Sequence, residues 1–153
     1  MTPPIRDTAK AVLRRAAGAD NRFAERGVTS EMVDAWAAIL DGKVWHDGAL
    51  DAVSHHYRTS RFSVMPADVV DYCQRQPVWA CRERAAIWLD SLTEAELHKI
   101  STYSGLPMPD PTFDVRDIRN YAANLVRHLR TWAIAEREAI LDGILATRYE
   151  VNR

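Results

Sequence analysis

The sequence predicts an all-α protein, a compact multi-helix domain that continues into a long C-terminal helix. Apolar residues recur at spacings of three and four through most of the 153-residue chain. This spacing places them on one face of an amphipathic helix. The strict alternation of apolar and polar residues that marks a half-buried strand is nearly absent. Only 6 residues are glycine, so few positions interrupt the helical pattern.

Two helices are expected before residue 41. The first covers residues 5–17 and ends at the stop signal over residues 18–21. The second runs to Leu40 and can be capped by Thr29 or Ser30, because a hydroxyl at that place accepts a hydrogen bond from the first-turn amides.

Two further helices are expected before residue 77. Asp47 can cap the third, which extends to Arg58. Pro66 suits the first turn of the fourth, where its missing amide hydrogen costs nothing. That helix must end near Gln76, because Pro77 follows.

The second half of the chain contains three more predicted helices. The fifth covers residues 78–89, and capping-box spacings at Ser91 and Thr93 predict the start of a sixth. A stiff, proline-rich connector over residues 107–111 follows. Asp114 can cap a last helix that continues to about Tyr149. At the rise of an α-helix, its length would be roughly 50 Å.

Composition and charge restrict the classes of protein to consider. The best candidate for a domain boundary is Arg75-Gln76-Pro77, which would separate a helical domain over 1–76 from a helical extension over 77–153. The alternative is that the two parts form one continuous domain. The net charge of -1 predicts no global attraction to nucleic acid or to anionic membranes. No signal-peptide core or membrane-length apolar run is present. A cytoplasmic protein without a membrane partner is therefore expected.

The residue types that carry catalysis do not form a recognisable constellation. His55 and His56 are adjacent, so their rings point about 100° apart on a helix and do not suit a zinc site. We expect His56 to lie half-buried beside Tyr57 and His55 to face solvent. Cys73 and Cys81 have no neighbouring base and are interpreted as buried small hydrophobic residues. With no glycine-rich phosphate loop either, the sequence predicts a non-enzymatic protein without metal or cofactor.

Arginine residues of the predicted last helix fall on one side of it. At about 100° per residue they lie within a wedge of roughly 80°. They are Arg116, Arg119, Arg127, Arg130, Arg137 and Arg148. The neighbouring strip is apolar and consists of Val115, Ile118, Ala122, Leu125, Leu129, Ala133 and Ile140.

This arrangement has three interpretations. In the first, the helix belongs to the core and the arginine stems cover its apolar edges. In the second, the arginines form a docking surface for nucleic acid or an acidic partner. In the third, the helix mediates self-association, for example in a homodimer.

The segment from Trp36 to Val69 carries a pattern of apolar anchors and helix starts. Trp36 and Leu40 lie in one predicted helix, Ala49-Leu50-x-Ala52-Val53-x-x-His56-Tyr57 forms the next, and Met65-Pro66-Ala67-Asp68-Val69 begins a third. Over residues 28–75 this pattern resembles the N-terminal domain of phage and prophage replicative-helicase loader/inhibitor proteins of the actinobacterial phage type. The resemblance implies a small adaptor that binds a DnaB-type helicase without hydrolysing ATP. The matching positions define a fold more than a site, so no binding residue is transferred.

The sequence therefore predicts a non-enzymatic phage replication accessory protein that binds a replicative helicase as loader or inhibitor. Two alternatives remain open, a small helical DNA-binding regulator of phage origin and a homo-oligomeric module that binds a host protein. The helices over 47–58 and 66–76 have the order of a helix-turn-helix. Their join, over 59–65, is longer than the usual turn. Asp68 and Asp71 also make the second helix acidic, whereas a recognition helix should be basic or rich in amides.

Overall fold

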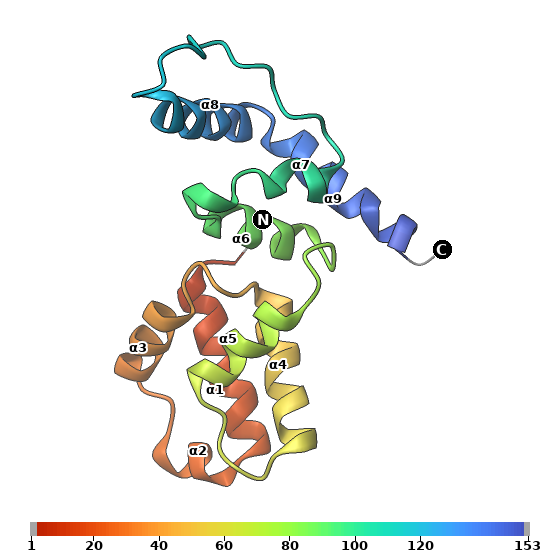
Figure 1. The fold of residues 1–153 in the computed structure, drawn as a ribbon. Helices are drawn as coiled ribbons and strands as arrows, with labels where there is room; N and C mark the ends of the chain where they lie inside the picture. Colours follow the sequence, from red (N-terminus) through yellow and green to blue (C-terminus); the bar gives the residue numbers. More distant parts are fainter. Residues whose placement is uncertain (1–2, 152–153) are drawn as a thin grey trace. The chain divides into compact units, whose positions relative to one another are not determined.

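The computed structural model describes residues 3–151, with side chains described for residues 3–147. The described residues form α-helices and one short 3-10 helix and contain no strand, which confirms the predicted all-α class. The chain divides into two compact units, Met1–Pro77 and Val78–Arg153 (Figure 1). We refer to them as unit 1 and unit 2 and describe each separately.

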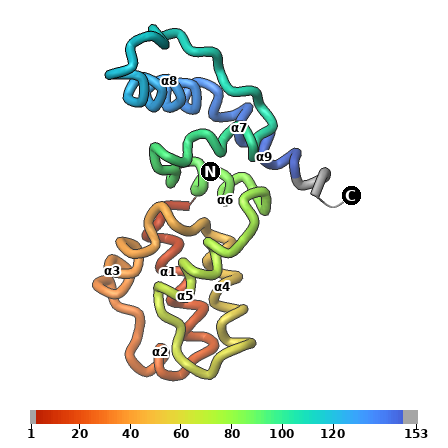
Figure 2. Tube along the Cα trace, in the orientation of Figure 1, coloured from red at the N-terminus to blue at the C-terminus, as the bar shows by residue number. Residues whose placement is uncertain are grey.

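Unit 1 contains five helices arranged around α1. They are α1 (Ile5–Ala19), α2 (Asn21–Arg26), α3 (Ser30–Leu40), α4 (His46–Thr59) and α5 (Pro66–Arg75). α1 packs against α2, α3 and α4, and α5 packs against α3 and α4 (Figure 2). The core of the unit includes the fully buried side chains of Leu13, Leu40, Val53 and Val69. These contacts bury the apolar faces that the helical spacing predicted.

Local signals placed several helix starts in unit 1 correctly. The Thr29 hydroxyl accepts a hydrogen bond from the amide of Met32 at 3.2 Å, as the capping prediction requires. Pro66 occupies the first turn of α5, and the Asp68 carboxylate accepts from the amide of Met65 at 2.8 Å. The prediction that Asp47 caps α4 was wrong. The cap position is Trp45, and Asp47 lies in the first turn, where the helix dipole favours an acid.

α2 was not predicted, because Asp20 was interpreted only as part of a stop signal. Asp20 does end α1, where its amide donates to the carbonyl of Ala16 at 2.8 Å. Its carboxylate then caps α2 by accepting from the amide of Arg22 at 3.0 Å. One residue therefore ends one helix and starts the next.

The Asp20 carboxylate is also the centre of a hydrogen-bond network. It is 5% exposed and accepts from Arg22 Nε at 2.9 Å, Tyr57 Oη at 2.9 Å and Ser63 Oγ at 2.8 Å. The Arg22 guanidinium holds the pKa of this carboxyl well below its usual range, with further bonds from Ser63 and Tyr57 acting in the same direction. The network joins α2, α4 and the loop over residues 60–65.

Unit 2 contains α6 (Arg82–Ser91), η1 (Glu94–Glu96), α7 (Lys99–Ser104), α8 (Tyr121–Ala135) and α9 (Arg137–Val151). α9 packs against α6, α7 and α8. Its apolar side chains Ile140 and Ile144 are fully buried together with Ile100 of α7. α9 is therefore the central helix of this unit.

The helices predicted at the start of unit 2 begin later than expected. α6 starts at Arg82 and not at residue 78, because the Cys81 sulfur accepts from the amide of Arg84 at 3.4 Å and caps the helix there. The capping box at Thr93 is confirmed, but it opens only the short η1. The Glu96 carboxylate accepts hydrogen bonds from the Thr93 hydroxyl and amide and from the Lys99 ammonium. These bonds lower the pKa of Glu96 to about 2.

The prediction of one continuous helix from Asp114 to Tyr149 was wrong. Asp114 caps no helix; its carboxylate accepts from the amide of Arg116 at 2.9 Å in a local turn, so the side chain competes with helix formation. α8 begins only at Tyr121, and the helix breaks at Glu136, where φ is -104° and ψ is 20°. Val115 and Ile118, expected on the apolar stripe, are exposed.

One glycine permits a close helix contact in unit 2. A Cβ at Gly143 would lie 2.2 Å from the carbonyl oxygen of Ser104. Only a residue without a side chain therefore lets α9 approach the end of α7 this closely. Among the described residues, no helix is long and apolar enough to cross a membrane.

Candidate partner-binding site

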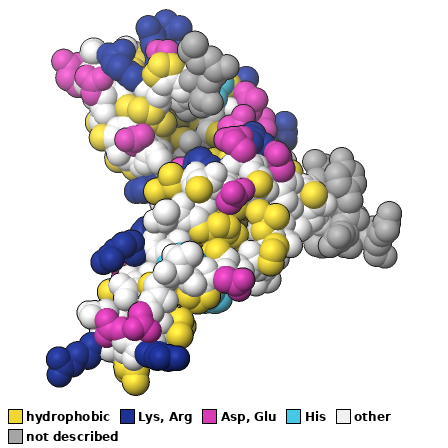
Figure 3. All heavy atoms as spheres, turned by 90° about the horizontal axis from the view of Figure 1, so that it is seen from above, with side chains coloured by type: hydrophobic (Ala, Val, Ile, Leu, Met, Phe, Trp, Pro, Cys, Tyr) yellow, Lys and Arg dark blue, Asp and Glu magenta, His cyan; other side chains and the backbone are white. Residues whose placement is uncertain are grey.

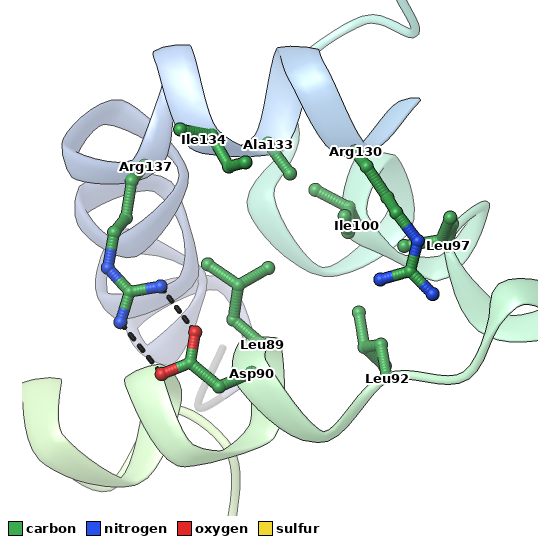
Figure 4. A pocket seen from close by; sticks show the side chains of 9 residues that line it. All are labelled: Leu89, Asp90, Leu92, Leu97, Ile100, Arg130, Ala133, Ile134 and Arg137. Carbon is green, nitrogen blue, oxygen red and sulfur yellow. Dashed lines mark hydrogen bonds and ion pairs between the residues drawn. The ribbon is translucent and has the colours of Figure 1, made fainter. Parts of the chain in front are cut away.

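A pocket of about 260 Å³ lies within unit 2 (Figure 4). Its walls come from α6, the turns on either side of η1, α7, α8 and the first residue of α9. The apolar lining consists of Leu89, Leu92, Leu97, Ile100, Ala133 and Ile134, and the charged residues at its edge are Asp90, Arg130 and Arg137. The pocket is therefore an apolar depression with charge at its edge.

The apolar lining has a buried floor and an exposed rim. Leu89, Leu92, Leu97 and Ile100 are buried in the core of the unit, whereas the side chain of Ile134 is 80% exposed. A single exposed isoleucine is common on protein surfaces. Here the exposed side chain continues a pocket with an apolar floor, and such continuous apolar surface is typical of a binding site.

An ion pair fixes one edge of the pocket. Arg137 donates to both carboxylate oxygens of Asp90, with Nη1–Oδ1 at 2.5 Å and Nη2–Oδ2 at 3.0 Å. Hydrogen bonding to Asp90 raises the pKa of Arg137. Because the contact is bidentate, it orients both side chains and ties the start of α9 to α6.

Arg82 makes a second connection between α6 and α9. Its guanidinium donates to Asp142 Oδ1 at 2.7 Å and also to the carboxylate of Glu138. The two ionic connections hold the helix that carries Leu89 against the central helix. They lie at the surface, so they orient the helices more than they stabilise the fold.

The other edge of the pocket carries a cation that is only loosely held. Arg130 Nη2 lies 4.0 Å from Glu94 Oε1, and about half of the Arg130 side chain is exposed. At that distance the contact is an ion pair without a hydrogen bond. The Arg130 guanidinium can therefore turn to a carboxylate of a bound partner at little cost.

The structure does not place the predicted arginines on one helix face. Arg130 and Arg137 lie at opposite edges of the pocket (Figure 4), whereas Arg116 and Arg119 lie in the segment before α8. Arg127 is exposed on α8 and lines a separate depression. Arg148 lies outside the residues whose side chains are described. On the face that Figure 3 shows, basic side chains lie in separate groups with acidic ones between them.

The residues considered for catalysis have structural roles. His56 is half-buried with its ring centroid 5.1 Å from that of Tyr57, and His55 is exposed, so both predictions are confirmed. Cys73 is fully buried, as predicted, but Cys81 is only partly buried and caps α6. Burial raises the pKa of the Cys81 thiol, which disfavours the reactive thiolate. No metal-binding group of His, Cys, Asp and Glu occurs among the described residues.

Sequence reasoning did not identify the floor of the pocket or Asp90. Leucine residues that line a pocket and leucine residues that fill a core have the same helical spacing, so no pattern separates them. Ile134 did carry a signal. It lies about 140° around the helix from Leu129, and so outside the apolar stripe.

No family model, no curated protein and no solved structure matches this chain.

Proposed function

We propose that this protein is a non-enzymatic phage-type replication accessory protein that binds a DnaB-type replicative helicase as loader or inhibitor. The observation that carries the proposal is the pattern over residues 36–69, which resembles the loader/inhibitor family. Most of its apolar positions are core positions of unit 1, among them Trp36, Leu40, Val53 and Val69. The pattern therefore specifies the packing of α3, α4 and α5.

The pocket of unit 2 is the surface we assign to the partner. Its volume of about 260 Å³ is below the roughly 300–1,000 Å³ of small-molecule sites. It matches one bulky apolar side chain of a partner protein. Arg130 at the edge favours a carboxylate next to that side chain. The expected partner surface is an apolar anchor with an acidic neighbour, as on an amphipathic helix.

The proposal is tested by calorimetric titration of the full chain into a panel of purified DnaB-type helicase hexamers. At least one helicase should bind, and Ile134→Asp should weaken that binding about tenfold or more. A charge at this position removes the apolar contact of a buried anchor, which is worth roughly 1.5–3 kcal/mol.

Ile118→Asp is the matched control. Ile118 is 87% exposed and lies outside the pocket, so the same substitution should leave the affinity unchanged. Absence of binding across the panel would overturn the proposed function. Binding that Ile134→Asp and Ile118→Asp affect equally would overturn the assignment of the pocket.

A further inference from the structure

The loop between α4 and α5, residues 60–65, exposes an aromatic side chain from an ordered backbone. Phe62 is 67% exposed. Its amide donates to Ser60 Oγ at 3.1 Å, and its carbonyl oxygen accepts from His56 Nε2 at 2.8 Å. The Phe62 backbone is thus bonded on both sides while its ring faces solvent.

The rest of the loop is joined to the buried Asp20 network. Arg22 Nη2 donates to the carbonyl of Arg61 at 2.8 Å, and Ser63 Oγ donates to Asp20. The amide of Val64 donates to Tyr57 Oη at 3.1 Å. An ordered loop that leaves its largest apolar side chain in water gives up the stabilisation that burial of that side chain would provide. Such preorganised exposure is typical of a contact surface.

The surroundings of the Phe62 ring are basic. The Arg61 guanidinium lies 5.8 Å from the ring centroid. Among the described residues, neither Arg61 nor Arg58 forms an ion pair with an acidic side chain. Arg22 and Arg26 on α2 are one helical turn apart, and α2 lies beside the loop at the lower end of unit 1 in Figure 1.

The acidic groups nearby only partly offset this charge. Asp20 is buried and bound to Arg22. Asp68 accepts from the Met65 amide and lies 3.8 Å from His56. Glu25 on α2 offsets one arginine. Arg58 and Arg61 therefore remain available to an anionic ligand, and both line one surface depression together with Phe62.

We propose that this surface, formed by α2, the end of α4 and residues 60–65, binds single-stranded nucleic acid. A base stacks on the face of Phe62, while Arg58 and Arg61 contact the phosphates next to it. Base stacking on aromatic rings combined with basic side chains along the backbone is how proteins bind single strands without sequence preference. A duplex does not offer an unstacked base to the ring. The inference does not depend on helicase binding.

Fluorescence anisotropy of the full chain with a labelled oligothymidylate tests the stacking at about 50 mM salt, where phosphate contacts are strong. Phe62→Leu keeps an apolar side chain but removes the ring, and should weaken binding about five-fold or more. Phe62→Tyr keeps the ring and should bind as the wild type does. Ile39→Ala, at another exposed apolar residue of unit 1, is the control and should have no effect.

The charge contribution has its own variant and control. Arg58→Gln should lower the slope of log affinity against log salt by about 0.7 for a single strand. Lys43→Gln should not, because Lys43 precedes the opposite end of the 14-residue α4, roughly 20 Å away.

Oligouridylate and a duplex of the same length complete the experiment. Binding of the DNA strand, the RNA strand or both upholds the proposal and identifies the ligand, and the duplex should bind more weakly. Three results would overturn it: no anisotropy change with either single strand, wild-type affinity in Phe62→Leu, or equal affinity for the duplex. None of these results would change the expected outcome of the helicase titration.

Discussion

Removal of one hydroxyl group tests the buried network of unit 1. Tyr57 Oη donates to Asp20 at 2.9 Å and accepts from the amide of Val64 at 3.1 Å. In Tyr57→Phe the ring remains, but the Val64 amide loses its partner beside a fully buried side chain. A buried donor left unsatisfied costs about 1–3 kcal/mol. Loss of the hydrogen bond from Tyr57 to Asp20 destabilises the folded state as well.

The expected loss of unfolding free energy corresponds to a shift in Tm that depends on the size of unit 1. For a domain of 60–100 residues, 1 kcal/mol lowers Tm by about 4–8 °C, so Tyr57→Phe should lower the Tm of unit 1 by at least about 4 °C. Far-UV circular dichroism gives the transition, and hydrogen exchange of the Val64 amide reports the local effect.

Tyr72→Phe is the matched control for this prediction. Tyr72 packs against the same core, and its ring lies beside His55. Its hydroxyl takes no part in the Asp20 network, so the variant should stay within about 0.5 kcal/mol of the wild type. The reasoning is refuted if Tyr57→Phe is as stable as Tyr72→Phe, or if the Val64 amide exchanges at the wild-type rate.

Three further predictions concern single residues. Because the folded-state pKa of Asp20 is depressed, its stabilising effect is present above the unfolded pKa near 3.9 and is lost as pH falls below it. Asp20→Asn should therefore flatten the acid limb of a pH–stability curve, and an unchanged limb would contradict this. Thr93→Val should raise the pKa of Glu96 from about 2 toward the ordinary glutamate value of 4.5, as measured by carboxyl NMR titration. A constant pKa would exclude the capping contact. Gly143→Ala should destabilise the protein by about 1–3 kcal/mol in urea unfolding. Gly18→Ala, at a helical site where a Cβ meets nothing within 4 Å, should stabilise the protein by about 0.5–1 kcal/mol. Equal changes in the free energy of unfolding for the two variants would contradict the close approach of α7 and α9.

The sequence predicted the helices of unit 1 apart from α2, and most of the helices that it predicted carry a local start or stop signal. The Thr29 hydroxyl and Pro66 act within a few residues of their own positions. Such signals are readable without tertiary information. Asp20 was misinterpreted because one side chain serves both the end of α1 and the start of α2.

The C-terminal region was less predictable because its geometry depends on tertiary contacts. Neither glycine nor proline marks the break at Glu136, and the apolar spacing continues across it. The break allows α8 and α9 to pack in different directions onto the core around Ile100 and Ile140. The arginine stripe was deduced from one straight helix, so it failed with that helix. Arg130 and Arg137 line opposite edges of one pocket because of the packing of unit 2.

The most direct test of the central claim is the ATPase and DNA-loading activity of a DnaB-type helicase that binds the full chain. With the helicase saturated, we expect either rate to change, with faster loading for a loader and slower loading or ATP hydrolysis for an inhibitor. Ile134→Asp should need a higher concentration to produce the same change, and Ile118→Asp should not. Unchanged rates with every helicase of the panel would contradict the proposed function.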